Sequence, residues 1–205
     1  MHWTTRKIAL ASALTAATIV IAYAKGLGMA SLPGLVEFMT VTIFVTGFCF
    51  GWRVGLVVGS IAVTLYMLIP SPFAHPAAWI FTTSPTLLAV MALLGAFYGV
   101  VGGVLGKIRN PEKKGLKFVV EIALWGGILT FIYDIFSSIG FYLAYPVYSS
   151  VFEAIVLTFM PLYYPYPPII HTATNIVVFA IVATPLIIAI QSAPFAKQVT
   201  ERFHF

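Results

Sequence analysis

Long apolar segments follow one another along this chain, and they constrain its fold more than any other feature. Stretches of about 20 apolar residues, the length that a helix needs to cross the hydrocarbon core of a bilayer, recur over the whole length. Charged residues make up only 8% of the 205 residues, whereas soluble domains carry roughly a quarter. The sequence therefore predicts an all-α integral membrane protein built as one membrane domain, residues 1–205.

Turn residues and helix signals divide this domain into six predicted transmembrane helices. Gly51-Trp52-Arg53 is expected to separate the second from the third, because one helix over both would be about 52 Å long and would exceed the hydrocarbon thickness. Pro185 predicts a kink in the last span. Val151–Leu162, of about a dozen residues, is too short for a span and is interpreted as interfacial or re-entrant. The predicted spans are 5–25, 35–50, 54–69, 85–106, 118–144 and 168–190.

The basic residues predict the orientation in the membrane. Six spans place both termini on one side, and ten of the eleven lysines and arginines then share that side. Only Lys25 falls on the other. The positive-inside rule makes the basic side cytoplasmic. We therefore expect a multi-pass plasma-membrane protein with cytoplasmic termini. The net charge of +5 is explained by basic residues that flank the spans, so the lipid bilayer is an expected partner and nucleic acid is not.

Several enzyme classes lack their motifs in this sequence. No glycine-rich loop ends in Gly-Lys-Ser/Thr for nucleotide hydrolysis, and no His-Glu-x-x-His is present for zinc. The single Cys49 supports neither a disulfide framework nor a thiol-rich metal site. No metal or cofactor is predicted. An enzyme hypothesis survives only as an intramembrane hydrolase that uses Glu37, Asp134 or His171.

The remaining polar residues are predicted to gather near the outer side. His171 and Asn175 open the last span four residues apart and so share one helix face. Asp134 lies about 25 Å along the fifth span from its cytoplasmic start, and Glu37 begins the second. Ionisable groups in or beside spans are costly, which makes them functional candidates. Each also has a structural interpretation: a buried pair, a helix-start charge, a capped helix end or a hydrogen bond between helices.

Aromatic residues accompany this group. His75 and Trp79 are expected in an outer loop, Glu153 in the outer segment, and Tyr142 and Tyr166 at the outer interface. Aromatic belts occur at membrane interfaces in any case, but a pocket that stacks a planar ligand would use the same residues. The sequence leaves both interpretations open.

Small residues form a stripe in the first span. Ala9, Ala13 and Ala17 recur every four residues, a spacing that lets another helix approach closely in lipid. That helix can belong to this chain, which is the simpler interpretation, or to a separate subunit.

Taken in order, these features resemble the substrate-binding S component of energy-coupling factor (ECF) vitamin transporters. The resemblance covers nearly the whole chain. It rests on the six-span layout in about 200 residues, the alanine stripe and three motifs. The motifs are Gly47-Phe-Cys-Phe-Gly51-Trp-Arg-Val-Gly55, Tyr133-Asp134 and His171-Thr-Ala-Thr-Asn175.

The resemblance implies a subunit that binds a vitamin or related micronutrient from outside and delivers it inward. Its partners would be a coupling membrane subunit, which docks on the alanine stripe, and two cytoplasmic ATPases. The acids would favour a ligand with a cationic or donor-rich group. An intramembrane hydrolase and a purely structural membrane subunit remain alternatives. By position in the family, the substrate-binding residues would be Glu37, His75, Trp79, Asp134, Tyr142, Tyr166, His171 and Asn175.

Overall fold

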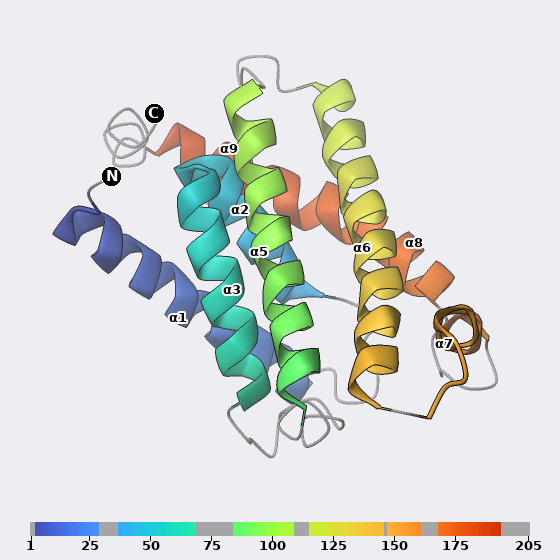
Figure 1. Ribbon diagram of the computed structural model, residues 1–205. Coiled ribbons are helices and arrows are strands. Elements are labelled where there is room, and N and C mark those ends of the chain that lie inside the picture. The colour runs from blue at the N-terminus through green and yellow to red at the C-terminus, as the bar shows by residue number, and fades with distance from the viewer. Residues whose placement is uncertain are drawn as a thin grey trace.

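The computed structural model describes residues 3–28, 37–68, 84–108, 115–145, 147–160 and 168–193, and every regular element within them is a helix (Figure 1). The elements are α1 (Thr5–Gly28), α2 (Phe38–Phe50), α3 (Trp52–Leu68), α5 (Pro85–Ile108), α6 (Leu116–Ala144), α7 (Val151–Phe159), α8 (Pro168–Val178), the π-helical η1 (Phe179–Ala183) and α9 (Thr184–Ser192).

Four stretches of helix in the described residues are long and apolar enough to cross a membrane. They are Thr5–Ala24 in α1, Pro85–Ile108, Leu116–Ala144, and Pro168–Ser192, which runs through α8, η1 and α9. The helices α2 and α3 are apolar but shorter, with 13 and 17 residues. The chain is therefore a multi-pass membrane protein, and the four long helices correspond to four of the six predicted spans.

Gly51 separates α2 from α3. Its φ of +92° lies in a region that side chains with a Cβ rarely adopt, and its N–H donates to the carbonyl of Gly47. The helix α3 starts at the next residue. The two helices then pack against each other as a hairpin, and the break falls within the tripeptide where the sequence predicted it.

The hairpin packs against α5 through backbone rather than side chains. A Cβ added at Gly99 would overlap the carbonyl of Gly55, and one added at Gly47 would overlap the carbonyl of Gly99. Gly59 and Gly95 face each other in the same way one turn further along. Small residues at such positions let helices approach in lipid, where dispersion rather than hydrophobic expulsion holds them together. The structure places α2, α3 and α5 in one tightly packed unit.

The helix α2 lies at the centre of the bundle. It contacts α1, α3, α5, η1 and α9, and its apolar residues are buried all round, including Ile43, Phe44 and Phe48. A helix that is hydrophobic on every face belongs in the interior of a larger body. The ring of Phe44 meets the ring of Phe179 edge to face, with 5.2 Å between centroids. This contact fixes the last span against the core.

The last span contains a π-helical turn instead of a simple proline kink. The backbone N–H of Thr184 donates to the carbonyl of Phe179, five residues back, directly before Pro185. Proline has no N–H to donate, so the helix around it needs an alternative hydrogen-bond pattern. The π turn provides this pattern, and the chain continues as α9. In Figure 1 the α8–α9 span crosses behind α5 and α6.

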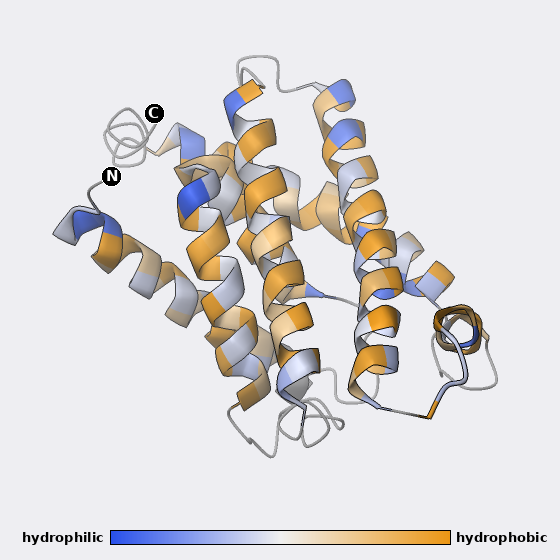
Figure 2. Cartoon of the chain, in the orientation of Figure 1, coloured by the Kyte–Doolittle hydropathy of each residue, from blue (hydrophilic) through white to orange (hydrophobic). Residues whose placement is uncertain are grey.

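Polar residues gather at the ends of the bundle. Figure 2 shows apolar colours along the middles of α3, α5 and α6 and hydrophilic colours at the start of α1, at the start of α3, at the end of α5 and at the start of α6, all toward the upper end of the view. The described lysine and arginine side chains lie at these helix ends: Arg6, Lys7, Arg53, Lys107 and Lys117. The described basic side chains therefore gather toward one end of the bundle.

Candidate functional site

A buried acid and a buried histidine meet between α6 and α8. The Nδ1 atom of His171 lies 3.0 Å from Oδ1 and 3.1 Å from Oδ2 of Asp134. Only 8% of Asp134 and 9% of His171 is exposed. The two helices come close because Gly127 of α6 leaves room for the side chain of Ile176 of α8. Of the interpretations weighed for Asp134, the structure shows that it has a paired partner, and that partner is a residue predicted for the same pocket.

Asn175 lies one turn beyond His171 on the same face of α8. Its side chain is fully buried, and neither Oδ1 nor Nδ2 has a hydrogen-bond partner among the described residues. A buried polar group left unpaired costs about 1–3 kcal/mol. Among the described residues, Asn175 therefore does not form the hydrogen bond between helices that the structural interpretation requires. A carboxamide with unused donor and acceptor capacity, one turn from the His171–Asp134 pair, is able to bind a ligand group.

Two further residues extend this group onto α5 and α6. The hydroxyl of Tyr98, a fully buried residue of α5, lies 3.2 Å from Oγ1 of Thr130. Thr130 in turn donates to the carbonyl of Gly126. Neither Tyr98 nor Thr130 was predicted as a site residue. The available signal was a tyrosine within the apolar, glycine-rich 85–106 segment, because a buried phenol usually needs a hydrogen-bond partner.

Glu37 completes the group from the start of α2. It occupies the N-cap position of that helix, and its charge interacts electrostatically with Asp134 and Tyr98. The sequence predicted that this helix starts at residue 35, whereas α2 starts at Phe38. We call the whole set the polar cluster; it joins α2, α5, α6 and α8 and consists of Glu37, Tyr98, Thr130, Asp134, His171 and Asn175.

Of the other predicted binding residues the structure describes Tyr142, which is not in the polar cluster. Tyr142 is half-buried in α6, two turns beyond Asp134, and no hydrogen bond or ring contact within the described residues joins it to the cluster. His75, Trp79 and Tyr166 lie outside the described residues. Among the described residues, no group of three or more His, Cys, Asp and Glu side chains could hold a metal ion.

Glu153 belongs to a separate local structure. Ser150 caps α7 by accepting a hydrogen bond from the N–H of Glu153, and the Glu153 carboxylate accepts from the N–H and the hydroxyl of Ser149. These hydrogen bonds lower the pKa of Glu153 from its ordinary value, and the bond from the Ser149 hydroxyl has the largest effect. Glu153 therefore stabilises the start of α7. This nine-residue helix is too short to span a membrane.

The alanine stripe faces away from the protein. Ala9, Ala13 and Ala17 are exposed, whereas the buried face of α1 carries Ala11, Thr15, Thr18 and Ala22. The hydroxyl of Thr15 donates to the carbonyl of Ala11 and that of Thr18 to Leu14, so the buried threonines need no outside partner. The simpler interpretation, in which the stripe packs within this chain, is wrong for the part of the chain that the structure describes.

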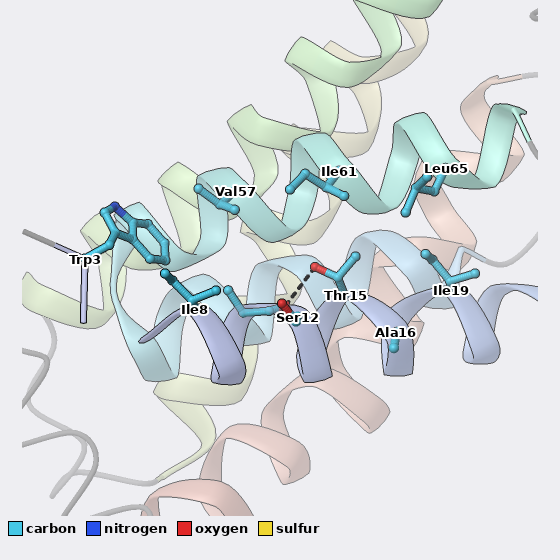
Figure 3. A pocket seen from close by; sticks show the side chains of 10 residues that line it. Trp3, Ile8, Ser12, Thr15, Ala16, Ile19, Val57, Ile61 and Leu65 are labelled. Carbon is cyan, nitrogen blue, oxygen red and sulfur yellow. Dashed lines mark hydrogen bonds between the residues drawn. The ribbon is translucent and has the colours of Figure 1, made fainter. Parts of the chain in front are cut away.

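An apolar groove adjoins the stripe. It lies between α1 and α3, has a volume of about 440 Å³, and has Trp3 at one end (Figure 3). Ser12 and Ala16 border it on the α1 side. Its wall on the α3 side is formed by Val57, Ile61 and Leu65. The exposed face of α1 therefore combines a flat row of alanines with a neighbouring depression.

These features define a class: a multi-pass helical membrane protein with a buried polar cluster and an exposed small-residue face. A comparison with protein families places the chain more narrowly. Residues 6–187 match the family described as "ECF transporter, substrate-specific component", and the chain belongs to this family. The resemblance seen in the sequence is thereby confirmed. Neither a search among curated proteins nor a search among solved structures found a match.

Proposed function

We propose that this substrate-specific transport subunit binds a vitamin or related micronutrient from outside at the polar cluster. The observation that carries the proposal is the buried carboxamide of Asn175, which has no hydrogen-bond partner in the described residues and lies one turn from the His171–Asp134 pair. The protein bears a desolvation cost there that a ligand would remove. A structural helix-pairing residue would instead be expected to make its hydrogen bonds within the protein.

The polar cluster opens to the outside in this proposal, and both termini are cytoplasmic. The support is the charge separation along α2: Arg53 lies just beyond the end of this 13-residue helix, whereas Glu37 lies at its start. With α2 and α3 as two short spans, the protein crosses the plasma membrane six times. Further binding residues, His75, Trp79, Tyr142 and Tyr166, would line the outer part of the pocket.

The alanine stripe on α1 is the proposed contact with the coupling membrane subunit. Its exposure leaves the row of small residues open to a second helix, and the adjoining groove can receive larger side chains from that helix. Two cytoplasmic ATPases would supply the energy, since the sequence contains no phosphate-binding loop of its own. Membership in a family of transport subunits favours this function over the intramembrane hydrolase.

Ligand-induced thermal stabilisation of the purified full chain in detergent tests the proposal. A ligand that binds only the folded state raises its stability, by about 2.7 kcal/mol at a concentration one hundred times Kd. We expect at least one member of a vitamin panel to raise the Tm and the Asp134→Leu/His171→Phe variant to lose that shift. If a monodisperse preparation responded to no vitamin in the panel, the proposed binding function would be refuted.

A further inference from the structure

We propose that the deep end of the polar cluster binds a neutral or cationic nitrogen-bearing ligand group that places an N–H donor beside an acceptor. Such an edge occurs in a carboxamide, a lactam or an amino-substituted nitrogen heterocycle. The inference rests on the proposed function, because it names the ligand chemistry that the same site would select. A ligand that enters this site through a carboxylate is excluded by the same argument.

Asn175 supplies the first reason. Its carboxamide presents one acceptor, Oδ1, and one donor, Nδ2, side by side in one plane, and both atoms are buried without a hydrogen-bond partner among the described residues. A ligand satisfies both atoms at once when it carries the complementary donor and acceptor in the same spacing. Asparagine pairs with adenine through two hydrogen bonds of this kind. A carboxylate offers two acceptors and leaves the Oδ1 atom of Asn175 unpaired.

The charges around Asn175 supply the second reason. The His171–Asp134 pair carries no net positive charge while Asp134 is ionised, because the carboxylate balances a protonated imidazole. Glu37 adds a second carboxyl group within electrostatic range of Asp134. Every lysine or arginine whose side chain is described lies in the first or last turn of α1, α3, α5 or α6, and the one on α6, Lys117, is 17 residues before Asp134. A carboxylate at Asn175 would thus meet acids without a described cation to offset them. An N–H donor or a cation would be stabilised there.

Two pairs of small probes separate these chemistries at nearly constant shape. Nicotinamide and nicotinate differ only in the carboxamide and the carboxylate, whereas adenine carries N–H donors beside ring-nitrogen acceptors and 9-methylpurine has no N–H at all. Each probe is added at millimolar concentration to the purified full chain, and the Tm is measured. We expect nicotinamide and adenine to raise the Tm and nicotinate and 9-methylpurine to leave it unchanged.

Variants at Asn175 connect the response to the proposed atoms. Asn175→Leu fills the same space without polar atoms, and we expect it to fold with an unchanged or higher Tm and to lose the response to adenine. Asn175→Asp removes the N–H donor, and we expect it to weaken the binding of adenine about tenfold or more. Val177→Leu, at an exposed position two residues along α8, is the matched control and should respond as the parent does.

Three outcomes would overturn the inference: a Tm shift with nicotinate but not with nicotinamide, an unchanged response to adenine in Asn175→Leu, or no response to any of the four probes. If Asn175→Leu does not fold, the Asn175→Asp comparison decides alone. These failures are distinct from failure of the proposed function. In the latter case no vitamin, acidic or nitrogenous, stabilises the parent chain.

Discussion

The Nδ1 atom of His171 lies 3.0 Å from Oδ1 of Asp134, although the two residues are 37 positions apart in the chain. Removing one member of a buried pair leaves an uncompensated polar or charged group and costs about 3–5 kcal/mol, whereas replacing both members with apolar groups is often neutral. We therefore expect His171→Phe to lower the free energy of unfolding by about 3 kcal/mol or more, as measured by thermal or denaturant unfolding in detergent.

The double variant Asp134→Leu/His171→Phe is the control for that prediction. It removes both polar groups together, so we expect it to be more stable than His171→Phe alone. If the double variant were the less stable of the two, the pair would not be coupled in the way that the short distance indicates.

The exposed stripe on α1 predicts a separation of ligand binding from transport. Ala13→Trp places a bulky side chain on the proposed docking face, so we expect it to abolish co-purification with the coupling subunit and substrate uptake. The ligand-induced rise in Tm should remain, because Ala13 is exposed and away from the polar cluster. Leu93→Trp, at a position of α5 that is 70% exposed, is the matched control and should assemble normally. Loss of ligand binding in Ala13→Trp with assembly intact would assign the stripe to another role.

The backbone contact between α3 and α5 predicts a strong response to one methyl group. In Gly99→Ala the added Cβ would overlap the carbonyl of Gly55, and overpacking of this kind costs about 1–3 kcal/mol. We expect a lower Tm for Gly99→Ala. Gly115→Ala is the control, because a Cβ there meets nothing within 4 Å. Equal Tm values for the two variants would show that the hairpin and α5 are less tightly packed than the structure indicates.

The cap of α7 predicts a local dependence on pH. Because hydrogen bonds from Ser149 lower the pKa of Glu153 from its ordinary value of 4.5, the carboxylate stabilises the helix start at pH values above about 4.5. That contribution is lost as the pH falls through the lowered pKa of the folded state. We expect amide hydrogen exchange in 151–159 to become less protected under acid, relative to α6. Glu153→Gln should exchange faster at neutral pH and show a weaker pH dependence.

Much of the membrane architecture could be predicted from the sequence because it depends on local composition. Hydropathy and length located the spans that became α1, α5, α6 and α8–α9, and Gly51 located the hairpin break. The high cost of burying polar groups in lipid selected Asp134, His171 and Asn175 without any knowledge of contacts. The six-span count and the cytoplasmic termini remain predictions.

Only the tertiary structure decided which groups meet, because contact between helices depends on how each helix is rotated about its axis. The periodicity of α2 provides no such information, since this helix is apolar on every side. The direction of the alanine stripe depends on the rotation of α1, and the Tyr98–Thr130 contact depends on the rotations of α5 and α6. By itself, the sequence determined a multi-pass membrane protein with three polar residues, Asp134, His171 and Asn175, inside or beside its spans. The packing of α6 against α8 decided that Asp134 meets His171 and that the carboxamide of Asn175 is buried beside them.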